Sequence, residues 1–141
     1  MDTHNIVIEK TNALDLTSFT SLVEEHWESF NNKPPKLNTS ILGNFSVVQA
    51  KDRNSLIGYV FYIVFLSPYH DEIWAQVDMF YLQPKYRKQG IGKQMFSMVE
   101  EDVKSKGASK LISSFNIKQP LEGFYNSMGF KSTHIAVAKE F

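Results

Sequence analysis

One short stretch, residues 87–93, constrains the fold most, because it joins two different secondary-structure patterns. Its sequence is Arg-Lys-Gln-Gly-Ile-Gly-Lys, and it lies between an apolar run, residues 77–82, and a helical pattern that starts at Gly90. A strand, a Gly-x-Gly turn and a helix in this order can point several backbone N–H groups in one direction. The positive end of the helix dipole strengthens their field. The stretch therefore predicts an anion-binding turn.

The charged residues around this turn are all basic. Four side chains in and beside it are basic: Lys85, Arg87, Lys88 and Lys93. No acidic residue lies between Asp78 and Glu100, although the whole chain has 15 basic and 15 acidic residues. The local excess therefore indicates a ligand that carries phosphate. The neutral total argues against a nucleic-acid partner, which needs a broad basic face.

Length and composition predict one domain that spans residues 1–141 and buries a core without disulfides, because the chain has no cysteine. The first residues lack the features of a signal peptide, and the longest apolar run, residues 57–66, is too short to span a bilayer. We therefore expect a cytoplasmic protein with no membrane partner. The four histidines are scattered without ligand spacing, so we expect no metal site.

Hydrophobic periodicity divides the chain into strands and helices. Six segments have strand patterns: residues 5–10, 45–50, 56–66, 72–82, 110–115 and 131–139. Four have helical patterns: residues 15–30, 36–42, 90–106 and 120–128. Consecutive strands early in the chain predict antiparallel hairpins, and a strand–helix–strand unit later predicts a parallel crossover. We expect a mixed α/β (α+β) sheet with helices on its faces.

Two familiar phosphate-binding loops do not fit the turn. A Walker loop needs G-x-x-x-x-G-K-[ST], a spacing that Gly90 and Gly92 do not provide. The dinucleotide fingerprint needs a third glycine where this chain has Met95. What fits is Arg-x-x-Gly-x-Gly, beginning at Arg87. Because Lys88 and Gln89 precede the helix, no side chain caps its free N–H groups, and a pyrophosphate suits them.

With the preceding sequence FYLQPKY, residues 80–86, this motif closely resembles the acetyl-coenzyme A loop of the GNAT N-acetyltransferase superfamily. The later sequence GFYNSMGF, residues 123–130, resembles the family's Phe-Tyr-x-x-x-Gly-Phe segment. The similarity is best from Asp78 to Phe130, and the whole pattern resembles phage-encoded members most. It implies a mostly antiparallel central sheet of six to seven strands with about four helices. It also implies a splayed strand pair at the coenzyme site, with a bulge near residues 79–81.

The resemblance implies an enzyme that moves acetyl from acetyl-coenzyme A directly to a primary amine. The acceptor class stays open between small molecules, peptide termini and lysine side chains. Residues at the end of one strand, in the turn, at the start of the helix and at two later positions are expected to bind the coenzyme: Phe80, Tyr81, Leu82, Arg87, Lys88, Gln89, Gly90, Ile91, Gly92, Lys93, Asn116 and Phe124. No metal is implied.

Tyr125 matches the family's general acid, and Asp78 occupies a strand position where the family often has an acidic residue that can act as base. A structural interpretation stays open for each: a core tyrosine, and a polar residue bonded at a strand end. Glu72 and His70 are alternatives for the base. His26, near the apolar face of the first helix, is either a structural histidine or part of the acceptor site.

Two other functions remain open from the sequence. A non-catalytic module could keep the coenzyme site for sensing or assembly, but it would need neither Tyr125 nor Asp78. A nucleic-acid binder that used Lys85, Arg87 and Lys88 would lose its affinity as salt increases. The family is often dimeric, so the resemblance is compatible with a homodimer, but the sequence does not fix the oligomeric state.

Overall fold

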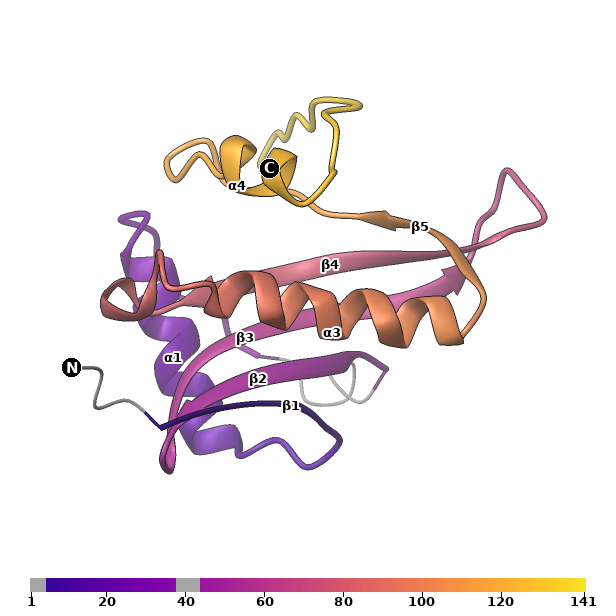
Figure 1. Cartoon of the computed structure of the whole chain (residues 1–141). Coiled ribbons are helices and arrows are strands. Elements are labelled where there is room, and N and C mark those ends of the chain that lie inside the picture. The colour runs from indigo at the N-terminus through magenta and orange to yellow at the C-terminus, as the bar shows by residue number, and fades with distance from the viewer. Residues whose placement is uncertain (1–4, 38–43) are drawn as a thin grey trace.

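The computed structural model describes residues 5–37 and 44–141, which form one mixed sheet covered by helices (Figure 1). The strands, in spatial as well as chain order, are β1 (Ile6–Thr11), β2 (Ser46–Asp52), β3 (Ser55–Leu66), β4 (Ile73–Leu82) and β5 (Ala108–Ile112). The helices are α1 (Leu16–Glu28), α3 (Ile91–Ser105) and α4 (Glu122–Ser127), and a short 3-10 turn, η1, spans Pro84–Tyr86.

The first four strands pair with their neighbours in antiparallel fashion, and β5 runs parallel to β4. The crossover that makes this parallel pair possible is α3. These pairings confirm the expectation of a mixed, mostly antiparallel sheet with helices on its faces. No helix in residues 5–37 and 44–141 is long and apolar enough to cross a membrane.

The numbers of strands and helices differ from the prediction of six to seven strands and about four helices. The described residues form five strands in the sheet and three α-helices. The strand predicted at residues 131–139 is not formed, and Ile135 and Val137 are 89% and 93% exposed. Alternating apolar residues suit a strand, but a strand also needs a hydrogen-bonded neighbour, which this segment lacks. The helix predicted at residues 36–42 lies mainly outside the described residues, and Lys36 and Leu37 are not helical.

Two helices cover opposite faces of the sheet (Figure 1). Asp15 caps α1, since its side chain accepts hydrogen bonds from the N–H groups of Thr17 and Ser18. The apolar side of α1 packs with Tyr59 and Phe61 of β3. The apolar side of α3 packs on the other face, where it meets alternate residues of β2, β3 and β4: Val48, Ala50, Val60, Tyr62, Ala75 and Val77. This alternation places one face of each strand in each core.

Strand β4 carries the irregularity that opens the sheet. Phe61 pairs with Met79 and Tyr62 with Val77, so Asp78 is an extra residue without a partner on β3. The bulge therefore lies one residue before the range in which it was predicted, 79–81. After it the side chains change faces: Val77 and Phe80 both pack on the α3 side, although three positions separate them. A bulge inserts one residue and reverses the alternation beyond it.

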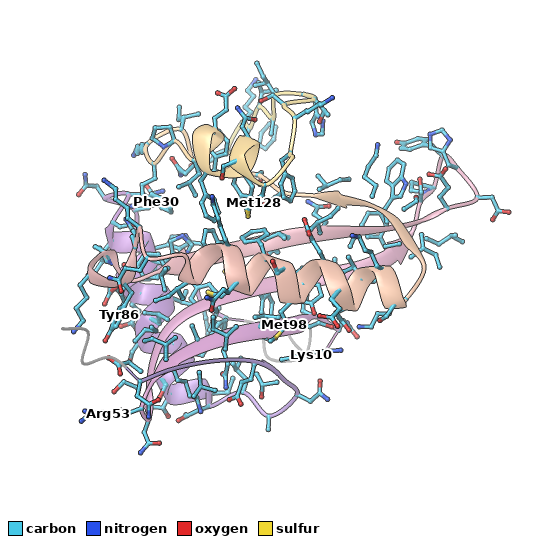
Figure 2. All side chains as sticks on the ribbon, in the orientation of Figure 1. Lys10, Phe30, Arg53, Tyr86, Met98 and Met128 are labelled. Carbon is cyan, nitrogen blue, oxygen red and sulfur yellow. The ribbon has the colours of Figure 1, made fainter. Side chains whose placement is uncertain are left out.

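The gap between β4 and β5 begins near the same bulge. Their pairing ends at Gln76 and Ile112, while β4 continues to Leu82. This divergence confirms the predicted splayed strand pair. The loop that follows β5 is tied to the end of α1, because Lys118 Nζ donates to the Phe30 carbonyl at 3.2 Å. Figure 2 shows Phe30 at the end of α1 nearest α4, so helix, loop and gap meet in one region.

Candidate active site

The turn before α3 has the backbone geometry of an anion-binding loop. Lys88 and Gly90 have positive φ angles of 62° and 83°, which turn the chain sharply into the helix. Gly90 is the N-cap residue, and no side chain caps α3. The first N–H groups of a helix have no partner inside it, so those of α3 are available to a ligand. A Lys in the left-handed region is unusual and indicates a constrained turn.

Gly92 lets the first turn of α3 lie close to two aromatic rings. A Cβ added there would be 3.1 Å from the Phe124 ring and 3.4 Å from the Phe80 ring. These two rings stack on each other with centroids 5.5 Å apart. The helix start, β4 and α4 therefore meet at Gly92, where a side chain would compete with the rings for space.

A cavity of about 560 Å³ opens in front of this turn. It is lined by residues from β4, the turn, the start of α3 and the segment that enters α4: Phe80, Tyr81, Leu82, Arg87, Lys88, Gly90, Gly92, Lys93, Gln119, Pro120, Leu121 and Phe124. Basic side chains come from the turn and the start of α3, and aromatic side chains come from β4 and α4. We call this space the coenzyme cavity, after the ligand that the sequence predicts.

Three of the predicted coenzyme residues do not line this cavity. The Gln89 amide donates to the Lys85 carbonyl at 3.0 Å, which supports the turn from outside. Ile91 is 6% exposed and belongs to the core under α3. Asn116 lines a neighbouring space instead. Conversely, Gln119, Pro120 and Leu121 line the cavity but were not predicted, since no local motif marks them.

A second space of about 290 Å³, here called the gap chamber, lies where β4 and β5 diverge. It is lined by His26, Phe30, Phe80, Ser114, Phe115, Asn116, Gln119, Leu121 and Tyr125. Phe80, Gln119 and Leu121 also line the coenzyme cavity, so the two spaces are adjacent. The gap chamber reaches from α4 on one side to α1 on the other.

Tyr125 lies on the α4 side of the gap chamber and is only 5% exposed. Burial raises the pKa of its phenol, and a hydrogen bond from Ser113 opposes that rise. The Ser113 hydroxyl donates to the Tyr125 oxygen at 2.7 Å, which leaves the phenolic proton free for another acceptor. The Phe115 ring stacks beside Tyr125 at 6.0 Å and helps to fix its orientation. Ser113 was not predicted from the sequence.

Asp78 is placed less favourably for a catalytic role. It is the extra residue of the β4 bulge, its side chain is exposed, and it lines neither the coenzyme cavity nor the gap chamber. Partial burial of its carboxyl nevertheless raises the pKa. The alternative bases, Glu72 and His70, also lie outside both spaces. Glu72 accepts hydrogen bonds from Trp74 and Ser109, so it has a structural role at the start of β4.

His26 forms the α1 side of the gap chamber. Its Nδ1 lies 2.6 Å from the Tyr59 hydroxyl, and its ring stacks on Tyr81 with centroids 4.6 Å apart. Burial, followed by the charge of Arg87, lowers the pKa of His26 to about 4. The ring is therefore uncharged at neutral pH. His26 is both a buried structural residue and part of the chamber wall.

The adjoining Glu25 is already engaged. One of its side-chain oxygens accepts from the Tyr81 hydroxyl at 2.6 Å and the other from the Gln83 amide at 3.1 Å. Tyr81 in turn lies under the Arg87 guanidinium, 5.5 Å from it. These contacts fix the end of β4 against α1. In the described residues, no group of three His, Cys, Asp or Glu side chains is placed to hold a metal ion.

Comparison with known proteins decides the family. The model of the acetyltransferase (GNAT) family matches residues 15–130 of this chain. The chain belongs to the GNAT family. The match includes both the turn at Arg87 and the Tyr125 segment, as the resemblance implied. A comparison with curated protein sequences finds no significant match.

Solved structures agree on the GNAT fold. A ribosomal-protein-alanine N-acetyltransferase from Brucella melitensis biovar Abortus 2308 matches with a TM-score of 0.79 at 20% identity, covering 98% of this chain and 100% of that one. An aminoglycoside acetyltransferase from an uncultured soil metagenomic sample gives 0.77 at 19%, covering 96% and 95%. A transcriptional regulator from Bacillus halodurans C-125 gives 0.77 at 18%, covering 97% and 100%. At these identities the likeness establishes the fold, and the acceptor is not identified by it.

Proposed function

We propose that this GNAT protein is an N-acetyltransferase that moves acetyl from acetyl-coenzyme A directly to a primary amine. One observation carries the proposal: a cavity with an anion-binding end leads to a second space whose wall contains the buried Tyr125 phenol. Phosphate recognition and a proton donor thus lie in two adjacent spaces that share lining residues. A protein that only bound the coenzyme would not need the second feature.

The residues present fit acetyl-coenzyme A. The free N–H groups at the start of α3, together with Lys88 and Lys93, would hold the pyrophosphate. In the described part of the chain, β4 has no strand partner on the β5 side beyond Gln76, so backbone groups between Gln76 and Leu82 are available to the amide groups of the pantetheine arm. The Leu82 carbonyl already accepts a hydrogen bond from Arg87. The bound coenzyme supplies an activated acetyl thioester. Phe80 and Leu121, shared by both spaces, would flank the thioester.

Tyr125 would protonate the leaving sulfur. A thiol has a reference pKa of about 8.5 and a phenol of about 10, so this proton moves uphill and the phenolate needs support. Ser113 gives that support, because its hydroxyl already donates to the Tyr125 oxygen. The chain has no cysteine to carry an acyl group, which agrees with direct transfer. Asp78 stays a proposed base from the sequence, and the geometry gives it no direct support.

The alternative function is a binding module that uses the coenzyme site without catalysis. One structural neighbour is described as a transcriptional regulator, and that name does not mention acetyl transfer. The gap chamber and the Ser113–Tyr125 pair favour catalysis here. A cytoplasmic location, a homodimer, the absence of a nucleic-acid partner and the likeness to phage-encoded members stay predictions from the sequence.

The test is a pair of measurements on the full chain. Calorimetric titration with acetyl-coenzyme A should show one saturable site, and release of the coenzyme A thiol should then be followed with small amines, peptides and lysine analogues. Amine-dependent release supports the proposal. Saturable binding without release from any acceptor favours the binding module, and no binding at all contradicts both.

A further inference from the structure

We propose that the gap chamber selects an acceptor amine that is uncharged at neutral pH, such as an arylamine, over an alkylammonium. This inference rests on the proposed acetyl transfer and names its substrate class. It depends on the lining, the surrounding charges and the size of the chamber.

Among residues 5–37 and 44–141, the lining of the gap chamber contains no Asp, Glu, Lys or Arg side chain. Four residues are apolar: Phe30, Phe80, Phe115 and Leu121. The others are polar without a formal charge: His26, Ser114, Asn116, Gln119 and Tyr125. An ammonium that left water for this chamber would lack a counter-charge, and burying an unpaired charge is costly.

Two charged groups near the gap chamber are positive and disfavour a cation inside it. Arg87 is close enough to His26 to lower its pKa, after burial, which is the larger cause. The Lys118 ammonium lies 3.2 Å from the carbonyl of Phe30, a lining residue. Both of these groups are positive, so they disfavour a further cation near the lining.

The nearby acids lie outside the lining. Hydrogen bonds from Tyr81 and Gln83 hold the Glu25 carboxylate at the end of β4. Arg87 lies over the same Tyr81 ring, so these two opposite charges partly offset each other there. Glu24 and Glu28 are exposed on α1, and Asp78 is an exposed bulge residue on β4. None of the four lines the gap chamber. An amine inside it would therefore face neutral polar groups and aromatic rings.

The volume of the gap chamber limits the size of the acceptor. About 290 Å³ lies just below the range for small-molecule sites, roughly 300–1,000 Å³. A single aromatic ring suits this size and the phenylalanine-rich lining, whereas an oligosaccharide with several ammonium groups does not. Polar groups on Asn116 and Gln119 could orient a ring substituent.

The reaction balances for an uncharged amine without an additional base. The nitrogen lone pair forms the new C–N bond to the acetyl carbon while the C–S bond breaks. The sulfur takes the proton of Tyr125, and the phenolate then takes the surplus proton from the nitrogen, which restores the phenol. An alkylammonium must first lose one more proton. At a reference pKa of about 10.4, only roughly one lysine side chain in 2,500 is uncharged at pH 7.

The experiment compares two isomers, p-toluidine and benzylamine, which have the same atoms but differ in charge at pH 7. We expect kcat/KM for coenzyme A release to favour p-toluidine by at least tenfold. In Asn116→Asp, which keeps the side-chain shape and adds a carboxylate to the lining, the ratio should move about tenfold toward benzylamine. Since this substitution leaves the protonation of either amine in solution unchanged, the shift reports on the chamber. Acetyl-coenzyme A binding to the variant checks its fold.

The outcomes separate this inference from the proposed transfer. Equal or better use of benzylamine, or an unchanged ratio in Asn116→Asp, would overturn the inference while leaving acetyl transfer intact. If neither amine is acetylated, calorimetric binding to the coenzyme A complex decides. Tighter binding of p-toluidine would uphold the selectivity, and the claim of transfer would then be decided by the wider panel of acceptors. Equal binding, tighter benzylamine binding or no binding of either would overturn the selectivity.

Discussion

At the scale of single residues, the proposed acetyl transfer depends most on the phenol of Tyr125. It is buried on the wall of the gap chamber, and its proton is free because Ser113 donates to its oxygen. Tyr125→Phe removes only the hydroxyl and should lower kcat roughly 10²- to 10⁴-fold. Binding of acetyl-coenzyme A, measured calorimetrically, should remain nearly unchanged, since the cavity lining is intact. An unchanged kcat would rule out the acid role.

Ser113 should act through Tyr125 rather than on the substrate. Its hydrogen bond opposes the rise that burial causes in the Tyr125 pKa, so Ser113→Ala should raise that pKa further and weaken the acid. We expect kcat to fall about tenfold, the loss of one hydrogen bond to a developing charge. Ser113→Thr should restore most of the rate because it keeps the hydroxyl. A threonine variant as slow as the alanine variant would point to packing instead.

The residues that the sequence revealed are those in local motifs. Arg87, Gly90 and Gly92 follow one another in a turn, and Tyr125 lies within a short segment with a recognisable pattern. His26 meets Tyr59 across 33 positions, and Ser113 meets Tyr125 across 12. No local periodicity encodes such contacts, because they depend on how the helices dock on the sheet. The placement of Asp78 likewise depends on a bulge whose position only the pairing of β3 and β4 defines.

At the scale of elements, the start of α3 depends on close approach by α4. Gly92→Ala would place a Cβ 3.1 Å from the Phe124 ring, so that ring must shift at the cavity wall. We expect at least a tenfold weaker affinity for acetyl-coenzyme A by calorimetry, although alanine favours the helix by about 1 kcal/mol. Gly123→Ala is the matched control, because a Cβ there meets nothing within 4 Å. Equal affinity in both variants would contradict the close-approach role.

Hydrogen bonds to Asp102 attach α3 to the sheet. Asp102 accepts hydrogen bonds from Lys10 of β1 and Tyr62 of β3, and also from Lys106 (Figure 2 shows Lys10). Burial raises the pKa of the Asp102 carboxyl, but these hydrogen bonds outweigh burial and lower it to about 2. Because the folded-state pKa lies below the unfolded value, this stabilisation is present above about pH 4 and is lost as the pH falls toward 2.

Asp102→Asn should therefore lower the free energy of unfolding by about 1–2 kcal/mol at pH 7. Its stability, measured by urea unfolding, should also vary less than that of the wild type between pH 4 and pH 2. Glu101→Gln, an exposed neighbour on the same helix, is the control and should have little effect. Identical pH curves for Asp102→Asn and the wild type would contradict the assignment.

The elements themselves were predicted well wherever their pattern was long. The predicted helix at residues 90–106 is observed as Ile91–Ser105, and the predicted strand at 72–82 as Ile73–Leu82. The strand predicted at residues 131–139 was wrong for the described structure. Its alternation indicates which residues would share a face, but not whether a neighbouring strand is in place.

At the scale of the whole molecule, the site depends on the sheet being interrupted. Two helices on opposite faces and a loop tied to α1 surround the gap that opens past Gln76. The coenzyme cavity lies at the start of α3, and the adjacent gap chamber reaches α1. The sequence identified the coenzyme side through its motif. The acceptor side is built from distant segments and therefore became visible only in three dimensions.

The most direct test is to follow acetyl transfer by the full chain and by Tyr125→Phe side by side. Coenzyme A thiol and acetylated amine would be measured together, by thiol titration and mass spectrometry. We predict that the wild type forms both products in equal amounts, with saturation in acetyl-coenzyme A, and that the variant is at least 100-fold slower, roughly the lower limit for a lost general acid. Failure of the wild-type chain to bind acetyl-coenzyme A, or to form any acetylated amine, would contradict the proposed function.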